Sequence, residues 1–316
     1  MTKIDSLVKG VLERDDLSIS KAITIVENDF PESNDLLIQL YPHTGKAAII
    51  GITGPAGSGK STLVGQLIRE YRKMKKTVGV VAVDPTSPFT GGAFLGDRIR
   101  MQDYVTGNGV FIRSMATRGN LGGLAKTTKD VVRILDASGK DIVIVETVGV
   151  GQAEVGIISV AHTTVLLFAP GLGDEIQALK AGLSEIGDVF VVNKADRENA
   201  EKTVNDINSI LNTGDIDGTW RPPIIKTIAI TGEGTEELIN LIDQHREYLK
   251  TGVFERRLRK SIETELIEEI KQKFTLHLTN NLKREVDFKS LVNQILKKEI
   301  DPYTAAELIL RKITIG

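Results

Sequence analysis

The strongest chemical signal in the chain is a glycine-rich run that ends in lysine and serine, Gly54-Pro55-Ala56-Gly57-Ser58-Gly59-Lys60-Ser61. It lies between an apolar, strand-like stretch at 47–52 and a helix-like stretch at 62–68, which is the context that a phosphate-binding P-loop requires. Glycines let the backbone curl so that successive N–H groups face one anion, and the positive end of the following helix adds to the attraction. The run therefore predicts a nucleoside triphosphate site rather than a glycine-rich surface turn.

Different residues of this run are expected to contact different parts of a bound triphosphate and its Mg²⁺. Lys60 can reach the β- and γ-phosphates, which makes it a predicted catalytic residue, and the hydroxyl of Ser61 can bind Mg²⁺. Main-chain groups can cradle the remaining phosphate oxygens. The further predicted nucleotide-binding residues of the loop and the first helical turn are Gly54, Gly57, Ser58, Gly59 and Thr62.

A second motif, Asn193-Lys194-Ala195-Asp196, follows an apolar, strand-like run and indicates which base is bound. Guanine carries two hydrogen-bond donors on one edge, N1–H and the exocyclic amine, and the carboxylate of Asp196 can accept both. Asn193 can bridge the base and the loop, while the stem of Lys194 can lie along the purine. A later strand end, at 229–234, can add a backbone contact to the base. Asp196 could instead cap a helix, but its place in a chain with a P-loop favours GTP and GDP as the ligands.

Three acidic residues are placed to hold the Mg²⁺ that accompanies a nucleoside triphosphate. Asp84 and Glu146 each end an apolar, strand-like run, and Asp97 lies in a loop expected at the phosphate end of the sheet. Mg²⁺ prefers one or two carboxylates together with phosphate oxygens and water. Ser61 and one of these acids would meet that need. Asp84 and Asp97 could equally be turn or cap residues.

Glu146 also begins a Glu-Thr-Val-Gly sequence whose spacing is typical of a nucleotide-sensing switch. The N–H group of Gly149 can contact the γ-phosphate, and hydrolysis would then release the loop. The usual acid at the first position is Asp, so Glu146 is a departure. Gln152 follows in a glycine-rich segment and is the candidate for orienting the attacking water. We therefore predict Glu146 and Gln152 as catalytic residues beside Lys60.

The segments around these motifs read as the scaffold that positions them. From Lys46 to about Leu249, apolar runs alternate with helix-like segments. Most runs are rich in Val and Ile and apolar on both faces, which is typical of a parallel sheet covered by helices on both sides. We therefore predict an α/β fold, a P-loop NTPase with a mostly parallel sheet flanked by helices. The predicted strands are 47–52, 77–83, 110–113, 141–146, 163–168, 189–193 and 224–230. The predicted helices are 60–75, 97–105, 122–137, 173–184, 196–212 and 234–250.

Helical segments are predicted at both ends of this domain. Residues before Lys46 carry apolar side chains at helical spacing and give no strand signal. Apolar residues recur every four positions along a charged stretch at 253–280, which predicts one apolar stripe on a long helix, and two shorter helices follow. That arm could bind a second copy of the chain or pack on its own domain, and one sequence does not separate the two. The predicted domains are an N-terminal helical extension at 1–42, a P-loop domain at 43–250 and a C-terminal arm at 251–316.

Composition narrows the function classes further. The chain has 316 residues and a net charge of -2, so no broad basic field favours nucleic acid as a partner. It contains no Cys, which excludes disulfides, thiolate catalysis and Cys-based metal sites. The N-terminus shows no apolar signal core, and no stretch approaches eighteen apolar residues. We therefore expect a cytoplasmic protein that does not enter a membrane.

Several longer runs resemble those of the MeaB/ArgK-type GTPases, relatives of the metallochaperone GTPases that carry Glu in the third GTP-binding motif. The most specific are Val83-Asp84-Pro85-Thr86-Ser87-Pro88 and Arg118-Gly119-Asn120-Leu121-Gly122-Gly123-Leu124. The other matching runs are 54–62, 95–101, 146–152, 173–180 and 193–196. The resemblance implies a GTP-hydrolysing chaperone that gates cofactor loading and protection of adenosylcobalamin-dependent methylmalonyl-CoA mutase or a close relative. It also implies a homodimer formed through the C-terminal arm.

The resemblance implies roles for individual residues as well. Lys60 and Ser61 would act on phosphate and Mg²⁺, the three acids named above would form the metal and switch cluster, and 173–180 would be a third mobile switch. Two alternatives remain open, and a third is disfavoured. One is a nucleotide-dependent kinase associated with Lys, Arg and Orn transport, and another is a GTP-binding module without hydrolysis. The third, a nickel-insertion metallochaperone, would need Cys or clustered His, which the chain lacks.

Overall fold

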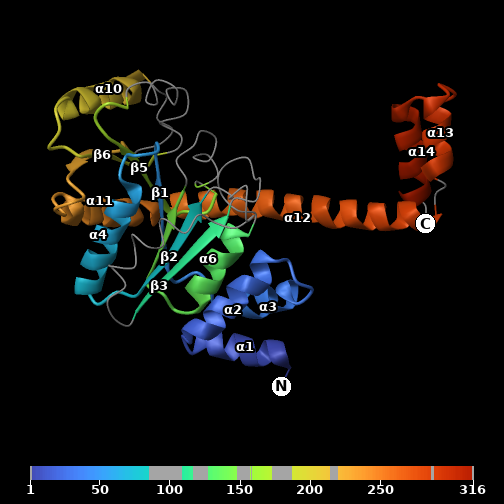
Figure 1. The fold of residues 1–316 in the computed structure, drawn as a ribbon, viewed down its shortest axis with the longest axis horizontal. Helices are drawn as coiled ribbons and strands as arrows, with labels where there is room; N and C mark the ends of the chain where they lie inside the picture. Colours follow the sequence, from blue (N-terminus) through green and yellow to red (C-terminus); the bar gives the residue numbers. More distant parts are fainter. Residues whose placement is uncertain are drawn as a thin grey trace. The chain divides into compact units, whose positions relative to one another are not determined.

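The chain divides into two compact units, Met1–Thr251 and Gly252–Gly316. A computed structural model describes residues 2–84, 109–116, 127–147, 157, 159–172, 187–213, 220–285 and 288–314. The first unit contains a sheet with helices on both faces (Figure 1), and the second is entirely helical in its described residues. Among the described residues, every helix is either too short or too polar to cross a lipid bilayer.

Seven strands form one parallel sheet in the order β3-β2-β4-β1-β5-β6-β7. This confirms the predicted α/β fold class, and each predicted strand forms within a few residues of its expected bounds. The last strand is shorter than predicted because the chain turns back after Thr227, where Ile228 bridges to Glu233. The strands are β1 (Ala48–Thr53), β2 (Val78–Asp84), β3 (Val110–Ala116), β4 (Ile142–Glu146), β5 (Thr163–Phe168), β6 (Val189–Asn193) and β7 (Ile224–Thr227).

Helices bury both faces of this sheet, as its doubly apolar strands require. On one face, α4 (Lys60–Lys73) and α11 (Thr235–Leu249) share a core with alternate residues of the strands. On the other face, α6 (Thr128–Ala137) covers β2 and β4, and α10 (Ala200–Thr213) covers β5 and β6. Because α4 follows β1 directly, the P-loop lies at the carboxyl end of a central strand.

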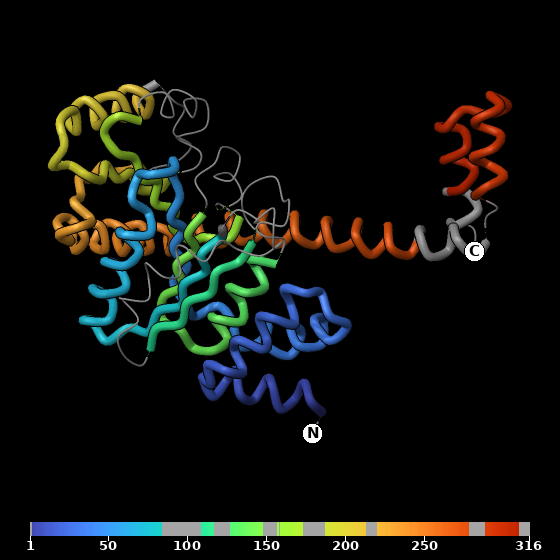
Figure 2. The backbone as a smooth tube through the Cα atoms, viewed as in Figure 1, coloured from blue at the N-terminus to red at the C-terminus, as the bar shows by residue number. Residues whose placement is uncertain are grey.

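The N-terminal extension folds against α6 as part of the first unit (Figure 2). It consists of α1 (Lys3–Leu12), α2 (Asp16–Glu27), α3 (Ser33–Leu40) and the 3-10 turn η1 (Tyr41–His43). The buried carboxylate of Asp136, on α6, accepts hydrogen bonds from the main-chain N–H groups of Gly45, Lys46 and Ala47. An ion pair between Arg113 on β3 and Glu27 on α2 adds a second link. The extension is therefore anchored to the sheet by both apolar and polar contacts.

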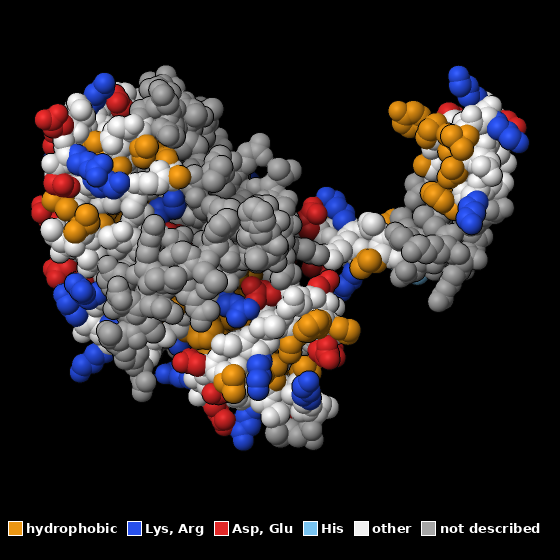
Figure 3. All heavy atoms as spheres, viewed as in Figure 1, with side chains coloured by type: hydrophobic (Ala, Val, Ile, Leu, Met, Phe, Trp, Pro, Cys, Tyr) orange, Lys and Arg blue, Asp and Glu red, His pale blue; other side chains and the backbone are white. Residues whose placement is uncertain are grey.

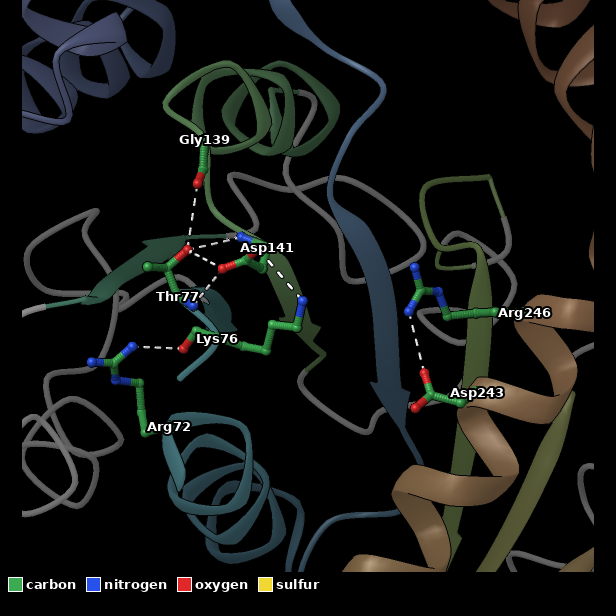
Figure 4. A network of polar contacts seen from close by, with 7 residues as sticks. All are labelled: Arg72, Lys76, Thr77, Gly139, Asp141, Asp243 and Arg246. Atoms are coloured by element: carbon green, nitrogen blue, oxygen red, sulfur yellow. Dashed lines mark hydrogen bonds and ion pairs between the residues drawn. The ribbon is translucent and has the colours of Figure 1, made fainter. Parts of the chain in front are cut away.

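A polar network also lies at the amino-terminal ends of β2 and β4 (Figure 4). The carboxylate of Asp141 accepts from the main-chain N–H and the hydroxyl of Thr77 at 2.7 and 2.8 Å. Burial alone would raise the pKa of Asp141, but the hydrogen bonds from Thr77 lower that pKa below its usual value. Arg72, at the end of α4, donates to the carbonyl of Lys76 at 2.7 Å. The contacts between Thr77 and Asp141 join the segments that lead into β2 and β4.

The second unit contains α12 (Val253–Glu285), α13 (Phe288–Leu296) and α14 (Pro302–Thr314). The three helices predicted from the sequence are present, and α12 continues beyond its predicted end at 280. Asp301 caps α14, since its carboxylate accepts the N–H groups of Tyr303 and Thr304, each at 2.9 Å. The predicted stripe on α12 is exposed, from 44% at Leu258 to 59% at Leu266.

Candidate active site

The P-loop joins β1 to α4 in a conformation that needs its glycines. Gly54, Gly57 and Gly59 have φ angles of 136°, 77° and 101°, in the region that side chains other than glycine rarely adopt. A Cβ atom on Gly54 would lie 2.0 Å from the carbonyl oxygen of Leu167, and one on Gly59 would lie 2.3 Å from Asn193 Nδ2. The loop therefore passes too close to β5 and to the end of β6 for larger residues at these two positions.

Lys60 begins α4 and folds back over the loop. Its Nζ donates to the carbonyl oxygens of Gly54 and Pro55 at 2.8 and 3.1 Å, and its side chain is buried. The ammonium group thus lies within the curl of the P-loop, among main-chain groups that precede it. A lysine that begins a helix directly after a glycine-rich loop is suited to bind a polyphosphate.

Ser61 and Glu146 come together at the base of the P-loop, as the sequence predicts. Ser61 Oγ donates to Glu146 Oε1 at 2.7 Å, and Glu146 is buried at the end of β4, the strand next to β1. The two side chains place a hydroxyl and a carboxylate oxygen side by side, which is a donor set that Mg²⁺ accepts. The described residues contain no group of three or more His, Asp or Glu side chains that could hold a metal by themselves.

The other predicted acid and switch residues are less fully described. Asp84 ends β2, two residues past Ala82, which pairs in register with Glu146. Its strand therefore ends at the same edge of the sheet, beside the strand of Glu146. The remaining candidates lie outside the described residues, and they are Asp97, Gly149, Gln152 and the segment 173–180.

The predicted base-recognition motif, residues 193–196, is bonded directly to the P-loop. Asn193 is buried, and its Nδ2 donates to the carbonyl of Ser58 at 2.8 Å. Its Oδ1 accepts from the N–H of Ala229 at 2.9 Å. Lys194, with a φ of 57°, donates from Nζ to the carbonyl of Gly57 at 2.6 Å. The motif therefore joins the P-loop to the loop that follows β7.

Asp196 is exposed and lies in the turn between β6 and α10. Because α10 begins at Ala200, Asp196 does not cap that helix, so the alternative explanation from the sequence is not supported. Its carboxylate remains available to a ligand at the carboxyl end of the sheet, on the same strand end as Asn193.

Sequence reasoning missed Gln66, a buried residue of α4 whose Nε2 donates to the carbonyl of Ala229 at 3.0 Å. The only signal in the sequence was an amide side chain within the apolar stretch of that helix. The P-loop helix and the base-recognition motif thus hold the same residue, Ala229, from two sides.

The family model described as methylmalonyl Co-A mutase-associated GTPase MeaB matches residues 19–283. The chain belongs to this family. The match confirms the resemblance seen in the motifs, and with the P-loop geometry it identifies the chain as a P-loop GTPase of the MeaB family.

Individual relatives agree with the MeaB assignment. A Pyrococcus abyssi protein named as a GTPase is 48% identical over 99% of this chain and 98% of its own length. The GTPase ArgK of Escherichia coli is 32% identical over 88% of this chain and 86% of its own length. A crystal structure described as LAO/AO transport system kinase aligns with a TM-score of 0.67 and 22% identity over 99% of both chains. That structure supports the fold of this MeaB-family chain.

Proposed function

We propose that this GTPase is a chaperone for an adenosylcobalamin-dependent mutase, methylmalonyl-CoA mutase or a close relative, whose cofactor loading and protection it gates. The observation that carries the proposal is the family match over 19–283, since that family is described as mutase-associated. In this function the GTP and GDP forms differ in conformation, and the partner responds to the difference.

Hydrolysis in this proposal is an in-line attack of water on the γ-phosphate of GTP. Lys60 and the P-loop amides hold the charge that develops on the phosphate oxygens. Ser61 and Glu146 would hold Mg²⁺, with Asp84 and Asp97 as the other proposed acids of the metal and switch cluster. When bound, the ion neutralises charge on the β- and γ-phosphates. Gly149 senses the γ-phosphate, and Gln152 orients the water.

Guanine recognition is assigned to Asp196, Asn193 and Lys194. Asp196 accepts the N1–H and amine donors, while Lys194 covers the purine with its stem. The O6 atom beside N1 is an acceptor, so it needs a donor that no carboxylate can supply. The main-chain N–H of Ile230 is proposed to supply it, because Asn193 is bonded to the preceding residue, Ala229. The N–H groups of Thr231 and Gly232 donate to the carbonyl of Ile228 instead.

Replacing Glu146 by glutamine tests the proposed metal site. Glu146→Gln keeps an oxygen that can accept from Ser61 but removes the negative charge. We expect the Mg²⁺ concentration for half-maximal hydrolysis to rise roughly tenfold or more, measured as phosphate release across an Mg²⁺ titration. Glu70→Gln is the matched control, because Glu70 is a largely buried carboxylate that pairs with Lys73 on α4. An unchanged Mg²⁺ dependence in Glu146→Gln would remove that residue from the metal site.

The helical arm is proposed to form a homodimer. Its exposed apolar side chains form a stripe on α12, with Leu258, Ile262 and Phe274 among them, and continue on α13 and α14. Figure 3 shows apolar side chains gathered on the α13–α14 pair. Phe288 and Tyr303 are 51% and 85% exposed there. Exposed apolar faces of this kind mark protein–protein contact surfaces.

The partner proposal is tested by capturing purified methylmalonyl-CoA mutase on the immobilised full chain. We expect retention to differ at least severalfold between GDP and a non-hydrolysable GTP analogue, because the nucleotide state is the signal. Equal or absent capture in both states would contradict the chaperone role.

The proposed homodimer is tested by light scattering on the free protein, which should give twice the 34.5 kDa mass of one chain.

The competing function is a kinase associated with amino-acid transport. Incubating the protein with γ-labelled GTP in a cell extract that lacks the mutase distinguishes the two functions. A kinase moves the label to an acceptor molecule, whereas the proposed enzyme releases it only as inorganic phosphate. Label on an acceptor in amounts that match GTP consumption would favour the kinase.

A further inference from the structure

We propose that Gln66 is a positioning residue for guanine recognition, which holds the loop 229–232 against α4 and thereby sets the lifetime of the bound nucleotide. The proposal rests on the proposed reading of guanine by Asp196 and this loop. It concerns a contact that neither the P-loop pattern nor the base-recognition motif contains.

Gln66 lies on the same helix that begins with Lys60, and its side chain is 4% exposed. Its Nε2 donates to the carbonyl oxygen of Ala229 at 3.0 Å. Gly232 passes the same amide closely, with a φ of 88°, since a Cβ atom there would lie 3.3 Å from Gln66 Oε1. One buried amide is therefore hydrogen-bonded to one end of the short loop after β7 and lies close to the other.

Both peptide groups of Ala229 are held from opposite directions. Its N–H donates to Asn193 in the base-recognition motif at 2.9 Å, and its C=O accepts from Gln66. Among the described residues there is no cis peptide bond, and in a trans peptide the C=O and N–H groups point in opposite directions. Because the carbonyl of Ala229 faces α4, the N–H of Ile230 faces away from that helix. Ile230 is 82% exposed.

The hydrogen bond gives Gln66 a positioning role in addition to its packing in the core. The loop must present a main-chain donor at a fixed place for guanine O6, and a peptide plane free to rotate would present it only part of the time. An apolar residue would fill the same buried position without the cost of burying an amide. The hydrogen bond also joins the helix that starts at the phosphates to the loop that reads the base, so the two halves of the nucleotide site are fixed to one another.

The decisive variant is Gln66→Leu, which keeps the volume and removes the donor. We expect dissociation of a fluorescent GDP, followed by stopped flow, to become about fivefold to tenfold faster, as loss of one buried hydrogen bond predicts. The kcat at saturating GTP should stay within about twofold of the parent, because Lys60 and Ser61 are untouched. Gln66→Glu places a carboxylate against the same carbonyl, so its dissociation should be faster still.

Tyr71→Phe is the matched control, since Tyr71 is also buried on α4 and its hydroxyl has no hydrogen-bond partner in the described structure. That variant should leave dissociation unchanged. Thermal unfolding of each variant in GDP-free buffer separates a folding defect from a defect in positioning.

A second readout isolates the contribution of O6. Inosine diphosphate keeps O6 and N1–H but lacks the exocyclic amine, so Gln66→Leu should weaken GDP and inosine diphosphate by the same factor. Asp196→Ala should weaken GDP more. If Gln66→Leu leaves both dissociation rates unchanged while Asp196→Ala has its expected effect, the positioning role of Gln66 is wrong and the base assignment stands. If Asp196→Ala also fails to separate the two nucleotides, the base assignment itself is wrong.

Discussion

Replacing Lys60 by alanine should lower the rate of GTP hydrolysis by about 10²-fold to 10³-fold, the loss typical of removing one preorganised charge-stabilising donor. The Nζ of Lys60 lies inside the P-loop, bonded to the carbonyls of Gly54 and Pro55. GTP affinity should fall more than GDP affinity, because the lysine is expected to reach both the β- and γ-phosphates.

Single-turnover phosphate release and calorimetric titration with GTP and GDP measure the two effects of Lys60→Ala. Lys73→Ala is the matched control, because Lys73 stands near the end of the same helix and pairs with Glu70 at 2.7 Å. The assignment of the phosphate site fails if Lys60→Ala hydrolyses GTP like the parent protein while Lys73→Ala is also unaffected.

Exchanging Asp196 for asparagine should cost about 10³-fold to 10⁴-fold in GTP affinity and transfer binding to xanthosine triphosphate. A site that pairs two substrate donors with one carboxylate can reject an unmatched base by about 10⁴-fold. Xanthine has a carbonyl where guanine has the amine, and the amide of asparagine can donate to it. Asp196 is exposed at the strand end where Asn193 is fixed to the P-loop, so the change alters the base edge without disturbing the core.

Competition between guanosine and xanthosine triphosphates for a fluorescent nucleotide measures the transfer. Glu198→Gln provides the comparison, since it neutralises another exposed carboxylate in the same turn. Retention of the parent's preference for GTP in Asp196→Asn would show that a different group reads the base.

Much of the site was predictable because its chemistry is local in sequence. The P-loop combines a strand, glycines with positive φ and a helix start within one short segment, so its shape follows from residue types alone. The parallel sheet was predictable for a similar reason, since strands covered on both faces must be apolar throughout. Ser61 and Glu146 meet because β1 and β4 are neighbours, and a parallel order brings their carboxyl ends to one edge.

Contacts that depend on how a loop or a helix packs against a distant segment were not predictable from patterns. The run at 228–230 is apolar, which predicts the end of a strand. Instead, Gly232 and Gly234 adopt φ angles of 88° and 80°, and the chain reverses into a loop. That reversal places Ala229 between Gln66 and Asn193, a juxtaposition set by tertiary packing alone. In the same way, the sequence around Asp136 does not predict that its carboxylate accepts hydrogen bonds from three N–H groups far away in the chain.

The Asp136 contact limits where the GTPase domain can begin in a chimeric protein. Its carboxylate accepts hydrogen bonds from the residues just before β1, the strand that leads directly into the P-loop. A cut after Ala47 would leave this buried acid without its partners. Any cut between the extension and the sheet would uncover the apolar side of α6. A GTPase domain moved into another protein should therefore keep its first three helices. Without them, β1, the strand that leads into the P-loop, loses the packing that supports it.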